Sequence, residues 1–130
     1  MPELFETLMI NRMTISNRFV RSATMDNMGS GGEVTEAQLN LYRDLARGEI
    51  GLIISTGIFP SQEGQAGDGQ LGAHCDAMIP SLKKLSGIVH ENGGKIAAQL
   101  LHGGWSCRSQ LTGHPPVGPS SIVNPSNGVQ

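Results

Sequence analysis

The chain has few aromatic residues and no excess of either charge. Aromatic side chains make up 4% of its 130 residues, and nine Lys and Arg face eleven Asp and Glu, for a formal net charge of −2. Without a basic stripe or a polybasic tail, the sequence predicts no binding of nucleic acid or of an anionic membrane surface. No apolar run approaches the roughly 20 residues that span a bilayer, and the N-terminus lacks the basic-then-apolar pattern of a signal peptide.

Cysteine is also scarce. The chain has two, Cys75 and Cys107, which could pair but do not make a disulfide framework. We therefore expect reduced thiols and a cytoplasmic location. Cys75 stands between His74 and Asp76, but this spacing matches no zinc pattern, so we expect no metal site there.

Glycine, in contrast, is abundant: 18 residues favour many tight turns over a plain helix bundle, and the length suits one domain. Thr35 and Gln38 form a capping box that predicts a helix start, and Gly48 is a good terminator. Apolar runs and turn residues predict the remaining elements. In all, the sequence predicts a hairpin over 7–16, strands over 18–24, 50–58 and 95–101, and helices over 36–47 and 77–91.

Strands that alternate with helices imply an α/β fold with parallel pairing and right-handed crossovers. Three parallel strands and two helices do not close a barrel, and they leave two open sheet edges, which natural folds cover or pair. Segment 61–75 is expected to be a long loop, a candidate for function or mobility, without the glycine order of a phosphate loop. Residues 106–130 show no periodicity, so we expect an irregular loop and a chain that looks cut off.

Gln99 is the most informative polar residue. It lies inside the apolar run 96–101, which reads as a buried strand, and His102, Gly103 and Gly104 follow. An unpaired buried amide costs about 1–3 kcal/mol, so Gln99 needs a partner, either backbone or a bound ligand. Barrels and open α/β sheets place their sites at the carboxyl ends of parallel strands, where this residue would lie.

Four segments together carry a resemblance to a known family. They are Leu4-Phe5, the run from Asn17 to Thr24, Gly51-Leu52-Ile53-Ile54, and the run from Gln99 to Gly104. In this order and spacing they resemble the N-terminal part of the Old Yellow Enzyme family, FMN-dependent NAD(P)H:flavin oxidoreductases and ene-reductases. The resemblance implies an N-terminal hairpin and the first three βα units of a TIM barrel, incomplete as given, with FMN at the carboxyl ends of the strands.

The resemblance also implies roles for single residues. Ala23 and Thr24 correspond to residues that line the flavin through their backbone, and Met25 stands where many members have Cys or Thr beside the flavin carbonyl edge. Gly57 corresponds to a small residue over the isoalloxazine ring. Gln99 corresponds to the amide that hydrogen-bonds the flavin pyrimidine ring, which fits its mixed donor and acceptor chemistry.

The sequence departs from the family in two places. Met25 is a weak acceptor, so a hydrogen bond that would tune the flavin potential is expected to be missing. Trp105 stands where the family usually has Arg. The substrate-binding His/Asn or His/His pair, a flavin-contacting Arg and the phosphate-binding loops would come from later strands, so the catalytic residues are unknown. His102 is expected to hold the loop at the strand end, and Cys107 has no cationic neighbour that would make it reactive.

Two functions remain open. The first is an oxidoreductase that passes hydride from NAD(P)H through FMN to an activated alkene or similar small-molecule acceptor. The second is a non-catalytic, truncated half-barrel that self-associates or pairs with another chain. We expect the 130-residue chain to be inactive alone and to form a homo-oligomer through its open edges. The sequence does not specify the acceptor, or NADH against NADPH.

Overall fold

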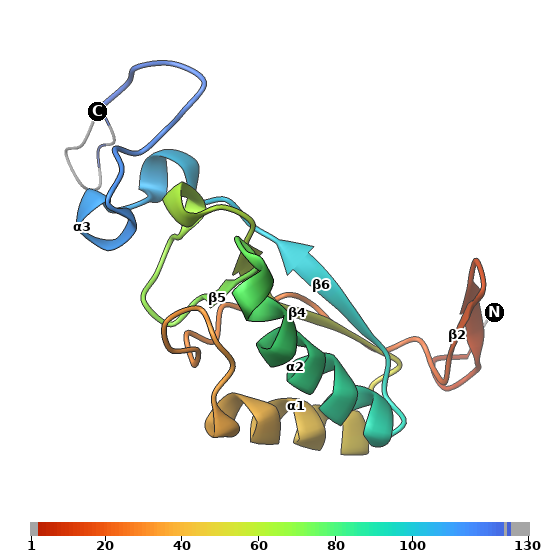
Figure 1. Ribbon diagram of the computed structural model, residues 1–130. Helices are drawn as coiled ribbons and strands as arrows, with labels where there is room; N and C mark the ends of the chain where they lie inside the picture. The colour runs from red at the N-terminus through yellow and green to blue at the C-terminus, as the bar shows by residue number, and fades with distance from the viewer. Residues whose placement is uncertain (1–2, 124, 126–130) are drawn as a thin grey trace.

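The computed structural model describes residues 3–123 and residue 125. A short hairpin precedes a parallel sheet, and two long helices cover one face of that sheet (Figure 1). The strands are β1 (Leu8–Ile10), β2 (Met13–Ile15), β3 (Val20–Arg21), β4 (Leu52–Phe59), β5 (Leu71–Gly72) and β6 (Ile96–Leu100). The helices are α1 (Glu36–Arg47), α2 (Ile79–Glu91) and the short α3 (Ser109–Thr112), with 3₁₀ turns η1 (Gln62–Gly64), η2 (Asp76–Met78) and η3 (Gly104–Ser106).

The expected hairpin and parallel order are confirmed. β1 pairs antiparallel with β2, and Asn11 at the turn adopts a φ of 53°, a left-handed conformation that Asn tolerates well. β3 and β6 both pair parallel with β4, in sequence order. Ile58 of β4 pairs with Leu71 of β5 as well as with Leu100 of β6, so β5 lies on the same side of β4 as β3.

Helix α1 begins and ends where local signals place it, whereas α2 begins at Ile79 and not at 77, because the 3₁₀ turn Asp76–Met78 precedes it. The Thr35 hydroxyl accepts a hydrogen bond from the Gln38 backbone N–H at 3.3 Å, which caps α1, and Gly48 follows its last residue. Pro80 lies in the first turn of α2, where its missing N–H is tolerated. The apolar faces of the helices pack on the sheet. The core consists of Leu39, Tyr42, Ala46, Ile53, Ile58, Leu71, Leu85 and Val89.

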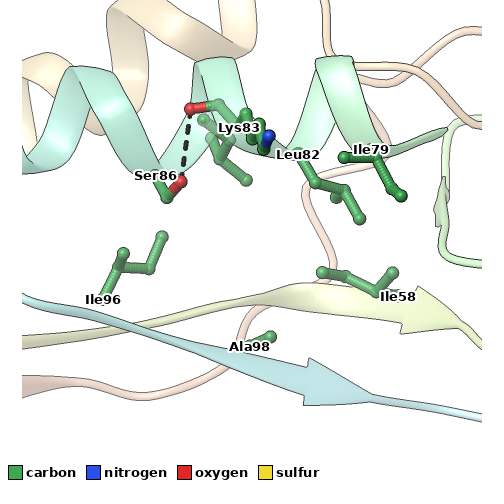
Figure 2. A pocket seen from close by; sticks show the side chains of 8 residues that line it. Ile58, Ile79, Leu82, Lys83, Ser86, Ile96 and Ala98 are labelled. Carbon is green, nitrogen blue, oxygen red and sulfur yellow. Dashed lines mark hydrogen bonds between the residues drawn. The ribbon is translucent and has the colours of Figure 1, made fainter.

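Helix α2 lies over β4 and β6. Figure 2 shows Ile79 and Leu82 of the helix facing Ile58 of β4 and Ile96 and Ala98 of β6, around a cavity of about 340 Å³. Because side chains alternate along a strand, Gln99 must point to the opposite face of the sheet, which α1 and α2 do not cover.

Four expectations need correction. The first strand is Val20–Arg21 and not 18–24, because it pairs with β4 only where that strand begins. The loop 61–75 contains η1 and the two-residue β5, which the Gly-rich composition concealed. The segment 106–130 is not irregular throughout, since α3 lies within it; residues 124 and 126–130 are outside the described residues.

The fourth correction concerns burial. The third strand was expected to be buried, yet β6 has no fully buried residue and Leu100 is 65% exposed. Among the described residues β6 pairs only with β4, so its outer edge is open. The apolar run 96–101 therefore indicates a strand but does not guarantee cover on both sides.

Asn17 fixes the amino ends of the strands. Its Oδ1 accepts hydrogen bonds from the backbone N–H groups of Phe19 and Gly51, both at 3.0 Å, and its Nδ2 donates to the Glu49 carbonyl at 2.6 Å. A Cβ on Gly51 would lie 2.4 Å from the Asn17 carbonyl oxygen, so no other residue fits there. One buried amide thus sets how β3 and β4 begin side by side.

Candidate cofactor site

The five residues proposed to contact a flavin lie near the carboxyl ends of the sheet strands. Ala23, Thr24 and Met25 follow β3, while Gly57 belongs to β4 and Gln99 to β6. Gly57 and Gln99 are Cα partners across the parallel pair, so the structure brings these two directly together. The hairpin lies at the other end of the sheet (Figure 1).

Gln99 projects from the helix-free face. Its side chain is half-buried and makes no hydrogen bond among the described residues, while its backbone N–H donates to Ser55 Oγ at 3.0 Å. Because Gln99 is not fully buried, water can hydrogen-bond its amide, and the amide does not require a protein partner. The amide remains available to an external molecule that offers both an acceptor and a donor.

The residues after β3 differ in what they contact. Met25 lies against β4, with its sulfur accepting a long hydrogen bond of 3.7 Å from Thr56 Oγ1, and it is 38% exposed. Thr24 is exposed and donates its hydroxyl to the Ser22 carbonyl at 3.2 Å, while Ala23 is half-buried. Met25 is therefore joined to the strand that carries Gly57, whereas Thr24 is held by its own backbone.

Gly57 has a packing reason of its own. A Cβ at this position would lie 3.0 Å from Leu101 Cδ1 and 3.1 Å from Leu101 Cβ, closer than nearly all real contacts. The Leu101 side chain therefore leaves little room for a larger residue at position 57, even without any ligand. Gly57 is itself buried, and the Leu101 side chain lies against it.

Three residues of the site escaped sequence reasoning: Tyr42, Ser55 and Thr56. The pairing of β4 with β6 shifts between Ile54 and Gly57, so Ser55 and Thr56 occupy an irregular stretch. The shift also explains why Ile53 and Ile58, an odd number of residues apart, both join the core beneath the helices. Two hydroxyl residues inside an apolar run were the available signal.

Helix α1 supports this stretch from below. Tyr42 is fully buried, and its hydroxyl oxygen accepts a hydrogen bond from the Thr56 backbone N–H at 2.7 Å. Burial raises the pKa of the Tyr42 phenol above its usual value; the Thr56 N–H lowers it in part, and the nearby Asp26 carboxylate raises it again. The phenol is therefore neutral at physiological pH and keeps its hydroxyl proton.

The loop after β6 is held by structural contacts. His102 Nδ1 accepts a hydrogen bond from the Gly104 N–H at 3.0 Å, and a Cβ on Gly64 would lie 2.6 Å from the imidazole ring. Cys107 is fully buried, and this burial raises the pKa of its thiol. These contacts give His102 a role in holding the loop and leave Cys107 in the unreactive thiol form.

No three His, Cys, Asp or Glu side chains in ranges 3–123 and 125 gather closely enough to hold a metal ion. In the same ranges, no helix combines the length and apolarity needed to cross a bilayer.

Comparison with known proteins assigns the fold to a family. Residues 3–129 match the NADH:flavin oxidoreductase / NADH oxidase family. The chain belongs to this family. Among solved structures, the Old Yellow Enzyme homologue from Zymomonas mobilis superposes with a TM-score of 0.88 at 31% identity, over 95% of this chain and 35% of that one. The α/β fold is thus the N-terminal part of an Old Yellow Enzyme barrel.

Two curated relatives agree with this assignment. A metal reductase from Desulforamulus reducens is 35% identical over 125 residues, which are 96% of this chain and 19% of that protein. The probable NADH-dependent flavin oxidoreductase YqiG from Bacillus subtilis is 35% identical over 121 residues, 91% of this chain and 32% of that protein. The chain therefore spans about a fifth to a third of the length of these relatives.

The residues present fit part of a flavin site of the Old Yellow Enzyme type. Gln99 carries a primary amide that no described side chain engages, and Gly57 lies beside it without a side chain. A flavin pyrimidine ring alternates carbonyl and N–H groups, which a primary amide can match. Met25 lies against Thr56, the residue before Gly57, and its sulfur already accepts a hydrogen bond from the Thr56 hydroxyl.

Proposed function

We propose that the chain forms one wall of the FMN site of an Old Yellow Enzyme-type oxidoreductase. The supporting observation is the Gln99 amide, which projects from the helix-free face beside Gly57 with no side-chain hydrogen bond among the described residues. Bound FMN would supply the redox chemistry, accepting hydride from NAD(P)H and passing it to an activated alkene or similar small molecule. A cytoplasmic location belongs to the same proposal, since both cysteines are free thiols.

Each residue has a separate part in this wall. The Gln99 amide would orient the pyrimidine ring by donating to one ring atom and accepting from another. The backbone at Ala23 and Thr24 would line the ring, and Gly57 would let it approach β4 closely. Met25 would offer the flavin a soft, apolar contact instead of a strong hydrogen bond.

The proposal assigns no proton donor and no acceptor-binding group to this chain. We expect weak FMN binding by the 130-residue chain and no turnover, because the described residues include no further barrel strands and no phosphate-binding loops after strands seven and eight. The wall would work within a whole barrel.

A titration tests the cofactor role. FMN added to the chain is expected to shift the amide resonances of Gly57 and Gln99 and to quench flavin fluorescence. Replacing the amide by Gln99→Leu should weaken binding about tenfold, since one or two hydrogen bonds to the ring are lost. Gln110→Leu, at an exposed position of α3, serves as the control. Equal FMN affinity in the wild type and Gln99→Leu would count against the role.

The second candidate is a non-catalytic half-barrel that pairs with a copy of itself. It is favoured by the open edge of β6 and by Leu100 and Phe5, which are 65% and 77% exposed. Unpaired strand edges promote association between chains. Native mass measurement separates the candidates when combined with the titration: a dimer that leaves FMN free would support self-association alone.

A further inference from the structure

The irregular stretch of β4 lies directly before Gly57, the Cα partner of Gln99. β4 is otherwise apolar, yet Ser55 and Thr56 are 1% and 0% exposed. The pairing with β6 shifts across them, from Ile54 opposite Ala97 to Gly57 opposite Gln99. Such a shift leaves backbone groups outside the regular ladder, and buried polar groups of this kind need partners.

Ser55 ties β4 to Gln99. Its Oγ accepts a hydrogen bond from the Gln99 backbone N–H at 3.0 Å and donates one to the Thr56 carbonyl at 2.8 Å. The hydroxyl takes the place of a backbone acceptor in the ladder. It therefore fixes the position of the Gln99 backbone relative to β4.

Thr56 ties the same strand to the segment after β3. Its Oγ1 donates to the Met25 sulfur at 3.7 Å and accepts from the Asp26 backbone N–H at 3.5 Å. Both bonds are long, so the hydroxyl guides this segment more than it clamps it. Its backbone N–H is held from the helix side by the Tyr42 hydroxyl at 2.7 Å.

We propose that Ser55 and Thr56 are positioning residues: Ser55 sets the place of Gln99, and Thr56 sets the place of Met25, against the edge of the bound flavin. This inference rests on the proposed function. It goes beyond it because neither hydroxyl would touch the cofactor. From the central strand β4, the Ser55 hydroxyl bonds to β6 and the Thr56 hydroxyl bonds to the segment after β3. One irregular stretch thus aligns β4, β6 and the segment after β3.

A purely structural role is the competing explanation. In that case the hydroxyls would only satisfy backbone groups of the irregular stretch, and their loss would reduce stability without altering bound flavin. The two explanations differ in what happens at saturating FMN, where a stability change no longer affects the flavin environment. The absorption maximum and the reduction potential of bound FMN are therefore the deciding measurements.

The test uses the 130-residue chain with Ser55→Ala and Thr56→Val, and Thr56→Ser restores the hydroxyl. Two control variants remove hydroxyls elsewhere in the fold: Ser86→Ala, whose hydroxyl donates to the Lys83 carbonyl within α2, and Thr14→Val on β2 of the hairpin. In Ser55→Ala we expect the Gln99 amide proton to exchange about tenfold faster and FMN to bind about three- to tenfold more weakly. In Thr56→Val the Asp26 amide should exchange faster and the bound-flavin spectrum should shift, and Thr56→Ser should restore both.

The outcomes separate the two levels of the proposal. A wild-type chain that leaves FMN free at millimolar concentration contradicts the proposed function and this inference with it. A wild-type chain that binds FMN, while Ser55→Ala and Thr56→Val bind it with unchanged affinity, spectrum and potential, overturns this inference alone. If Ser55→Ala does not fold, the Thr56→Val and Thr56→Ser pair decides in the same way.

Discussion

The two faces of the sheet are held by different interactions. On the face beneath α1 and α2, apolar side chains interlock, and Ile53, Leu85 and Val89 are 0%, 3% and 0% exposed. On the opposite face, Gln99 is half-buried and Ala97 is exposed. Burial of apolar area thus stabilises the helix-covered face, whereas the other face is less buried and contributes less to folding.

Ser55 and Thr56 connect these faces. They lie in the strand that both faces share, and Tyr42 reaches them from the helix side. The packed face thereby determines the geometry of the open one. A site built in this way is rigid where it is supported and accessible where it binds.

The largest expected contrast is between two leucines. Leu85→Ala should lower the free energy of unfolding by about 2–5 kcal/mol, because Leu85 is 3% exposed and its loss leaves a cavity under α2. Leu100→Ala, at a site 65% exposed, should change it by less than about 0.5 kcal/mol. Urea denaturation of both variants measures the difference. Equal losses would mean that the edge of β6 is covered in solution, as self-association would require.

Local signals explain which elements the sequence predicts well. Helix α1 was expected over 36–47 and is found there, because Thr35 and Gly48 define its ends through nearby backbone groups. Strand β5 was missed because two residues, Leu71 and Gly72, form it only by pairing with β4. Composition and periodicity cannot reveal a strand that is only one period of the pattern long and that forms by pairing with another part of the chain.

The candidate site likewise combines residues that local sequence signals place with residues that only strand pairing places. Gln99 was placed on a strand by the apolar run 96–101, and its direction follows from alternation along β6. Ser55 and Thr56 could not be placed, because the shift in pairing between Ile54 and Gly57 depends on how two strands meet. Whether the five proposed residues contact FMN stays a prediction for the titration described above.

A smaller effect is expected at the connection between the faces. Tyr42→Phe removes the acceptor of the buried Thr56 N–H and should cost about 1–3 kcal/mol at neutral pH. Burial raises the pKa of Tyr42 in the folded state. The stabilisation is therefore fully present below about pH 10, the unfolded value, and is lost as the pH rises through the higher folded value. Denaturation between pH 7 and 11 should show the two proteins converging; parallel curves would contradict the assignment.

The smallest expected effect is that of Gln99→Leu on folding. Among the described residues the Gln99 side chain makes no hydrogen bond, so its loss should change the free energy of unfolding by less than about 0.5 kcal/mol. Asn17→Leu is the contrasting amide variant, since it leaves two N–H groups and one carbonyl without their partner and should cost about 2 kcal/mol or more. Thermal and urea denaturation measure both. If Gln99→Leu proves as destabilising as Asn17→Leu, the amide is structural after all, and its place in the strand needs no cofactor to explain it.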